Sequence, residues 1–111
     1  MSDPVPAIVT VYAVFGSAEE AQAIGRAMVE RRLAACVNIL GECHSIYRWR
    51  GQVEEGREVA AMFKTRADRA QPLIDAIAAL HSYDVPAAVV WPIAHALPDY
   101  TQWVVEESID S

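Results

Sequence analysis

Apolar and polar residues recur along this chain in blocks that predict four strands and three helices. Residues 7–15 (AIVTVYAVF) are an apolar run rich in β-branched and aromatic side chains, which is typical of a buried strand. Gly16 ends this run, and Ser17 followed three residues later by Glu20 is the capping-box pattern that opens a helix. We expect this helix to end near Arg32. Its apolar face would comprise Ala21, Ile24, Ala27 and Met28.

A long β hairpin is the next feature of the pattern. Residues 34–49 predict one extended strand, with a β-bulge expected around Gly41. Arg50-Gly51 would form the turn, and residues 53–65 would return as the partner strand. Both strands are much longer than the ~5–6 residues typical of a strand. A hairpin of this length overhangs a small sheet, and its edge invites aggregation unless another subunit covers it. The hairpin therefore predicts an oligomer.

The rest of the chain predicts a helix, a strand and a short terminal helix. The second helix spans residues 68–81 and begins its regular part around Gln71, because Pro72 is tolerated only near a helix start. Residues 87–95 form the last strand, where Pro92 must face an edge or a bulge. A second capping-box pair, Asp99 and Gln102, would open the terminal helix. The buried stripe of the second helix would comprise Leu73, Ile74, Ile77 and Leu80.

The resulting order, β-α-β-β-α-β followed by a short helix, matches an α+β fold, the ferredoxin-like split βαβ sandwich. With 111 residues, we expect a single domain over residues 1–111. The 53% hydrophobic content excludes a disordered chain.

Charge and hydropathy narrow the range of partners. Nine Lys and Arg stand against fifteen Asp and Glu, giving a net charge of -6, so we expect no nucleic-acid partner. Apolar runs fall short of the ~20 residues of a membrane span, so we expect no membrane partner. No basic residue precedes the first apolar run, so no secretory signal is predicted.

Cys36 and Cys43 lie seven residues apart in one predicted strand, on opposite faces unless a bulge intervenes. We therefore expect free thiols and a cytoplasmic location.

The sequence contains no phosphate-binding loop, dinucleotide fingerprint or zinc-spaced cluster. His81 ends the second helix, where it is either a residue favoured by the exposed helix carbonyls or a metal ligand. His44 and His95 have no second ligand at helical or hairpin spacing. Cys43 would meet a soft metal only if the fold brought it to a histidine. The acidic residues of the hairpin, Glu54, Glu55 and Glu58, would form a solvated strand face.

Several aromatic residues fall outside the regular core pattern. They lie in the hairpin, in the loop after the second helix and in the terminal helix, at Tyr47, Trp49, Tyr83, Tyr100 and Trp103. Large rings at such positions are typical of a protein interface or of a ligand pocket. Both interpretations stay open at this point.

A set of motifs spans almost the whole chain in a fixed order. They are LAACVNI at 33–39, SIYRWRG at 45–51 with Glu54, Lys64-Thr65, HSYDVP at 81–86, and Tyr100 with Trp103. Together they resemble the CutA family of divalent-cation-tolerance proteins. The resemblance implies a homotrimer of ferredoxin-like subunits whose long hairpins embrace neighbouring sheets. It also implies a role in tolerance of Cu²⁺ and other divalent metal ions, usually in the cytoplasm and without an established catalytic reaction.

The chain departs from the family at positions linked to copper. Phe15 stands where the family has a cysteine, Leu80 precedes a single His81, and Ala87 replaces a typical Glu. Ser82 likewise replaces a proline. His81 is therefore the metal ligand that the resemblance leaves.

The resemblance also suggests an intersubunit cleft. Its candidate residues are Tyr47, Trp49, Glu54, Lys64, Tyr83, Asp84, Tyr100 and Trp103. They would either lock a trimer through ion pairs and ring packing, or bind a ligand whose anionic group meets Lys64. A ligand site would make the protein a small-molecule sensor like the trimeric PII-type regulators, although the short Arg50-Gly51 turn and the few cations argue against it. We favour a non-enzymatic CutA-like trimer.

Overall fold

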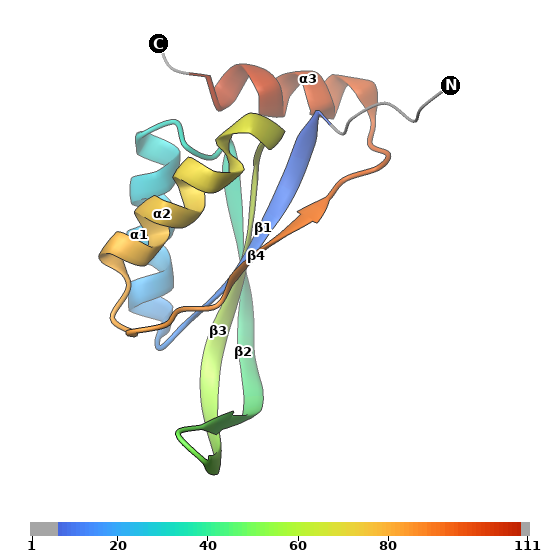
Figure 1. The fold of residues 1–111 in the computed structure, drawn as a ribbon. Coiled ribbons are helices and arrows are strands. Elements are labelled where there is room, and N and C mark those ends of the chain that lie inside the picture. Colours follow the sequence, from blue (N-terminus) through green and yellow to red (C-terminus); the bar gives the residue numbers. More distant parts are fainter. Residues whose placement is uncertain (1–6, 110–111) are drawn as a thin grey trace.

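The computed structural model describes residues 7–109, which form a four-stranded antiparallel sheet and three helices (Figure 1). The sheet has the strand order β2-β3-β1-β4, which is that of the predicted ferredoxin-like α+β fold. Its strands are β1 (Ile8–Phe15), β2 (Cys36–Trp49), β3 (Gln52–Arg66) and β4 (Ala88–Pro92). The helices are α1 (Ala18–Glu30), α2 (Ala70–Leu80), which follows the 3₁₀ turn η1 (Ala67–Arg69), and α3 (Pro98–Glu107).

Two expectations concern residues at the ends of the chain. Residues 1–6, on which the absence of a secretory signal was predicted, lie outside the described residues. The single domain over residues 1–111 likewise stays a prediction. Within residues 7–109, no helix has both the length and the apolar character needed to cross a membrane.

The core lies between α1, α2 and one face of the sheet. β1 pairs with β3 on one side and β4 on the other, so it is one of the two inner strands of the sheet. Val11, Ala13 and Phe15 point to the helical face and are completely buried. The core residues that they join include Ile24 and Met28 of α1, Phe63 of β3, and Leu73 and Ile77 of α2. Full burial of each large apolar side chain contributes about 1.5–3 kcal/mol, so this cluster is the main source of stability.

One of the two hydrogen bonds of the predicted capping box forms at the start of α1. The Ser17 hydroxyl accepts a hydrogen bond from the Glu20 N–H at 3.1 Å. The Glu20 carboxylate reaches back to the Gly16 N–H, at 3.1 Å, and not to that of Ser17. The shift leaves the second carboxylate oxygen of Glu20 pointing out of the turn, where it binds the loop described below.

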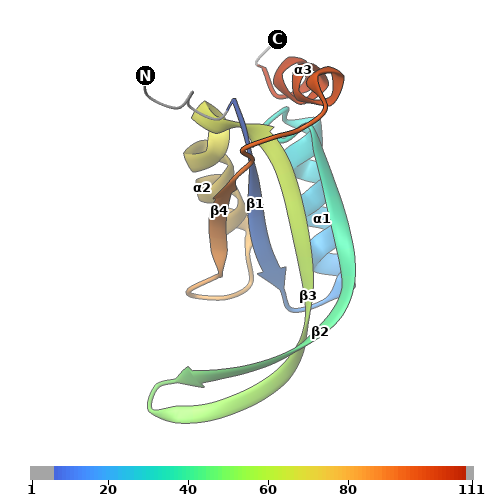
Figure 2. The ribbon, with the colours of Figure 1, turned by 90° about the vertical axis from the view of Figure 1, so that its right-hand side faces the viewer.

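The β2–β3 hairpin overhangs the sheet, as the sequence predicted. Pairing continues to Trp49 opposite Gln52, and residues 43–58, here called the arm, curl beyond the helices (Figure 2). The Cα radius of gyration is 14.9 Å, against about 13 Å for a compact domain of similar length. Ile46 and Val53 of the arm are more than half exposed. The arm therefore has no hydrophobic core of its own.

A β-bulge between Ile39 and Glu42 confirms the interruption expected around Gly41. It also changes the relation between the two cysteines. Cys36 lies opposite Lys64 and Cys43 lies opposite Glu58, and these partners share one face of β3. Both thiols are free, and they lie on the same face of the sheet because the bulge shifts the register by one residue, which is the exception that the sequence left open.

Three local predictions in the second half of the chain need correction. Leu80 is 44% exposed and not part of the buried stripe of α2, because α2 ends there beyond the edge of the core. Asp99 does not cap α3: Pro98 occupies the first helical position, and Gln102 donates its side-chain hydrogen bond to Glu106. β4 is shorter than expected and ends at Pro92, on an edge strand where a proline is tolerated.

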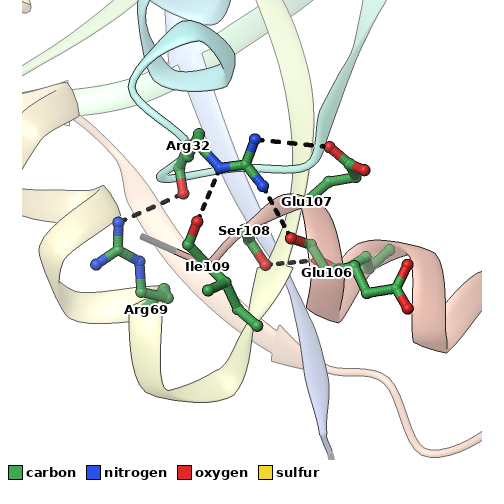
Figure 3. Close-up of polar contacts among 7 residues, drawn as sticks. Arg32, Arg69, Glu106, Glu107, Ser108 and Ile109 are labelled. Atoms are coloured by element: carbon green, nitrogen blue, oxygen red, sulfur yellow. Dashed lines mark hydrogen bonds and ion pairs between the residues drawn. The ribbon is translucent and has the colours of Figure 1, made fainter. Parts of the chain in front are cut away.

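The C-terminal end of α3 is tied to the loop after α1 (Figure 3). Arg32 has a positive φ of 60°, which is costly for a residue with a Cβ. Its guanidinium donates hydrogen bonds to the carbonyls of Ile109 at 2.8 Å and Glu106 at 3.0 Å, and lies 3.9 Å from the Glu107 carboxylate. Ser108, which is fully buried, donates to the Val104 carbonyl. These bonds hold α3 against the end of the sheet.

We predict that Arg32→Gly is more stable than Arg32→Ala. Both variants lose the guanidinium bonds, but alanine keeps the strained backbone that glycine adopts freely. The expected order of unfolding free energies is wild type, then Arg32→Gly, then Arg32→Ala, with about 1 kcal/mol between the two variants. Urea unfolding at one protein concentration measures it, and an Arg32→Ala variant as stable as Arg32→Gly would contradict the strain.

Candidate functional site

A cleft of about 680 Å³ lies between the arm and the loop that follows α2. Figure 2 shows the arm curling beneath this loop, which connects α2 to β4. Three elements supply the side chains that give the cleft its chemistry: Tyr47 and Trp49 from β2, Glu54 and Glu58 from β3, and Tyr83 and Asp84 from the loop. The cleft therefore combines aromatic rings with carboxylates.

His81 anchors the loop at its first residue. The Nε2–H group donates to the Val14 carbonyl at 2.7 Å, and Nδ1 accepts from the Tyr83 N–H at 3.0 Å. A carbonyl only accepts and an amide N–H only donates, so these partners fix the neutral Nε2–H tautomer. The ring also stacks on buried Phe15, with centroids 5.1 Å apart. His81 thus joins the end of β1 to the loop.

Glu20 makes a second connection to the same loop. Its carboxylate accepts from the Ser82 N–H at 2.9 Å as well as from Gly16. Partial burial raises the pKa of Glu20, but the hydrogen bonds from Ser82 and Gly16 outweigh it, so the pKa lies below its usual value. The charged carboxylate therefore fixes the loop relative to the start of α1.

Tyr83 spans the distance from the loop to the arm. Its hydroxyl donates to the Glu58 carboxylate at 2.9 Å, and its ring centroid lies 4.7 Å from that of His81. Gly16 lets the ring approach this closely, since a Cβ there would meet the Tyr83 ring and hydroxyl at a tight 3.3 Å. Burial, together with the hydrogen bond and charge of Glu58, raises the pKa of Tyr83 to about 12. The phenol therefore stays a hydrogen-bond donor at neutral pH.

The predicted cleft residues fall into two groups in one chain. Tyr47, Trp49, Glu54, Tyr83 and Asp84 line the cleft described above. The second group consists of Lys64, Tyr100 and Trp103. Ten residues of strand separate Glu54 from Lys64, which is roughly 33 Å. A single chain therefore does not bring the two groups together.

The second group lies where β2, β3 and α3 meet. Lys64 lies opposite Cys36 and donates to the side-chain oxygen of Asn38. The Tyr100 hydroxyl is 3.6 Å from the Cys36 sulfur, and its ring packs at 5.9 Å from that of Trp103. Burial, followed by the contact with Cys36, raises the pKa of Tyr100 to about 12.

The residues around His81 do not form a ready-made site for Cu²⁺. Each ring nitrogen already has a hydrogen-bond partner, so an ion at either nitrogen would displace one of these bonds. Over residues 7–109, no three His, Cys, Asp or Glu side chains are grouped to share an ion. His44 pairs with Glu55 on the arm, and Phe15 lies buried beneath His81. His81 as a metal ligand stays a prediction.

Sequence reasoning missed Gly16, Glu20 and Glu58 as parts of this site. Glu20 was assigned only to its cap, and Glu58 only to a solvated strand face. Strand alternation places Glu54 and Glu58 on one face of β3, and this signal could have linked them. The contacts of Glu58 with Tyr83 and of Glu20 with Ser82 join residues distant in sequence, and no local pattern encodes them.

We predict that two tyrosines ionise near pH 12. A tyrosine whose pKa rises from 10.0 to about 12 on folding contributes stability that is complete below pH 10. That stability is lost as the pH rises from 10 through 12. Absorbance of tyrosinate against pH measures the ionisation, and Tyr83→Phe and Tyr100→Phe should each remove one late component. A wild-type titration without a component near pH 12 would contradict the prediction.

Known proteins resemble this chain in sequence. The family model described as "CutA1 divalent ion tolerance protein" matches residues 9–107. The divalent-cation tolerance protein CutA of Thermus thermophilus is 44% identical over 92 residues, which cover 83% of this chain and 89% of the relative. Protein CutA of Mus musculus is 40% identical over 93 residues, or 82% of this chain. The chain spans about half the length of the mouse relative (52%).

A solved structure shows the same similarity in three dimensions. The periplasmic divalent cation tolerance protein CutA from Archaeoglobus fulgidus superimposes with a TM-score of 0.89 at 33% sequence identity. The match covers 92% of this chain and 99% of the archaeal chain. The similarity therefore includes the arm as well as the helical core.

Proposed function

Since this chain belongs to the CutA1 divalent ion tolerance family, we propose that it is a non-enzymatic homotrimer acting in divalent-cation tolerance. The observation that carries this proposal is a sheet face that α1 and α2 leave open and that α3 contacts only at the end near Ile8. Relatives named for divalent-cation tolerance support the role, and the resemblance to the CutA family supports three copies.

The open face is the side of the sheet opposite α1 and α2, turned towards the viewer in Figure 2. Strand register places Tyr12, Met62 and Val89 side by side on it. Trp91 stacks on Tyr12 with centroids 4.8 Å apart, yet Val89 and Trp91 each remain 45% exposed. A contiguous apolar surface of this kind is typical of an interface. Other copies of the chain would bury it.

The arm supports the same assembly. It carries exposed apolar side chains on a two-stranded ribbon, which is marginally stable alone in water. Packing of the arm against a neighbouring copy would bury these side chains. The two groups of predicted cleft residues, which one chain keeps apart, would then come from different copies.

We predict that Val89→Glu disrupts the assembly and Leu80→Glu does not. Both substitutions replace an aliphatic residue of nearly equal exposure, 45% and 44%, by a charge. Only Val89 lies on the open face, where burial of an unpaired carboxylate costs several kcal/mol. Light scattering after size-exclusion chromatography measures the mass. Equal masses for the two variants, whether both assembled or both dissociated, would contradict the proposed interface.

Metal ions would bind weakly in this proposal. Binding of Cu²⁺ to His81 competes with a hydrogen bond that holds the loop, so part of the binding free energy is lost. A single imidazole with scattered carboxylates also lacks the converging ligands of a tight site. Tolerance would then result from weak binding by the trimer and not from sequestration of copper.

We predict that His81→Ala lowers weak Cu²⁺ uptake, whereas His44→Ala leaves it unchanged. His44 is an exposed control, since its ring lies on the arm, where it pairs with Glu55, and not at the loop. Native mass spectrometry over a range of Cu²⁺ concentrations measures uptake, and circular dichroism checks that each variant is folded. Copper that survives a chelator, or equal uptake by wild type and folded His81→Ala, would contradict the proposal.

The alternative of a PII-type sensor for an anionic ligand fits the cleft poorly. Glu54, Glu58 and Asp84 line it, and Arg48 is the one cationic side chain beside them.

The cellular compartment stays a prediction: the sequence predicts the cytoplasm, whereas the Archaeoglobus fulgidus relative is described as periplasmic.

A further inference from the structure

His81 is connected to the arm through Tyr83. The Nδ1 atom of His81 accepts a hydrogen bond from the Tyr83 N–H at 3.0 Å. The Tyr83 hydroxyl donates to the Glu58 carboxylate at 2.9 Å, and this second hydrogen bond is here called the loop–arm bond. Both bonds belong to one residue, so the place of the Tyr83 backbone beside His81 also decides whether its hydroxyl reaches the arm.

The two ring nitrogens of His81 differ in what a metal ion would displace. Nε2 carries the proton and donates to the carbonyl of buried Val14 at 2.7 Å. An ion at Nε2 would leave that buried carbonyl without a donor, which is costly. Nδ1 has a lone pair in the tautomer that the structure holds, and its partner is the Tyr83 N–H. An ion would therefore bind at Nδ1.

An ion on Nδ1 would take the place of the Tyr83 N–H. A metal ion lies about 2 Å from an imidazole nitrogen that binds it. The Tyr83 nitrogen is 3.0 Å from Nδ1, so the amide has to move away when the ion arrives. Ser82 resists this movement, because its own N–H is held by the charged Glu20 carboxylate at 2.9 Å. The displacement therefore falls on Tyr83 and the residues after it.

The Tyr83 side chain has little room to stay in place while its backbone moves. Its ring centroid lies 4.7 Å from that of His81 on one side. On another side it passes so close to Gly16 that a Cβ there would meet the ring at 3.3 Å. A hydrogen bond weakens steeply as its length and angle depart from the optimum. Displacement of the Tyr83 backbone therefore breaks the loop–arm bond.

We propose that a divalent cation at His81 and the loop–arm bond exclude each other, so that metal binding disconnects the loop from the arm. This inference rests on the weak metal binding proposed above. The imidazole nitrogen favours Cu²⁺ or Zn²⁺ over Ca²⁺, which prefers oxygen ligands. Coupling of this kind is reciprocal: the loop–arm bond weakens metal binding by the same factor by which the metal weakens the bond. The chain thereby converts Cu²⁺ binding into a change in the contacts of its arm.

Removal of the Tyr83 hydroxyl tests this reciprocity. Tyr83→Phe keeps the ring and the N–H on Nδ1 but has no donor for Glu58. We expect it to bind Cu²⁺ about fivefold more tightly than the wild type, the factor that corresponds to one ordinary hydrogen bond. Native mass spectrometry of the full chain in its native assembly measures uptake over a range of Cu²⁺ concentrations. Equal or weaker binding by Tyr83→Phe would overturn the proposal.

Glu58→Ala and Glu55→Ala form a matched pair on the arm, since each removes one carboxylate from β3. Only Glu58 accepts the Tyr83 hydroxyl. Glu55 lies on the other face of the strand, where it pairs with His44. We expect Glu58→Ala to bind Cu²⁺ more tightly than Glu55→Ala, although the two variants have equal charge. Adding Tyr83→Phe to Glu58→Ala should give no further gain, because both remove the same bond. Equal affinities of the two single variants would contradict the coupling.

Hydrogen exchange follows the loop directly. Saturating Cu²⁺ should speed exchange of the Tyr83 amide in the wild type, because the ion takes its acceptor, whereas Ca²⁺ should leave the exchange unchanged. Unchanged exchange with Cu²⁺ bound would overturn the proposal. The two proposals fail in different ways. Cu²⁺ uptake that depends on His81 but shows no coupling overturns this inference alone, whereas uptake that does not depend on His81 overturns the proposed metal binding as well.

Discussion

The pairing of β2 with β3 along their whole length is the constraint on which the rest of this molecule depends. The hairpin shares the core only up to the bulge near Gly41, and beyond it the strands continue without a helix to cover them. Backbone hydrogen bonds keep the arm in register, but its apolar side chains remain exposed. The cleft follows from this overhang, and the proposed trimer would cover the side chains that the overhang leaves exposed.

The loop after α2 is the second half of the cleft, and it is held by buried or charged groups from the start of the chain. His81 binds the end of β1, and Glu20 binds the loop backbone at Ser82. These contacts place Tyr83 over Gly16, from where it reaches Glu58 on the arm. In a family linked to metals, this histidine therefore has a structural role that competes with metal binding.

Most of the fold could be predicted because its signals are local. These local signals predicted their elements correctly: the apolar run of β1, the cap at Ser17 and the proline near the start of α2. The errors arose where tertiary structure overrides a local pattern. The end of α2 left Leu80 outside the core, and Pro98 took the first helical position of α3, where Asp99 was expected to cap the helix.

The site could be predicted only in part. Three of the aromatic residues and Glu54 were identified from the hairpin and loop motifs and do line one cleft: Tyr47, Trp49, Tyr83 and Glu54. Lys64, Tyr100 and Trp103 lie at the other end of the chain's sheet, because strand length separates them from Glu54. Glu58 of the arm and Asp84 of the loop both contribute negative charge to the cleft. The folded structure was needed to show that these two residues line the same cleft.

The central claim is that the open face and the arm are completed by further copies of the same chain. Sedimentation equilibrium of the wild-type protein over a wide concentration range tests it most directly. The account predicts one species with three times the 12.2 kDa mass of a single chain. A mass of one chain at every concentration would contradict it.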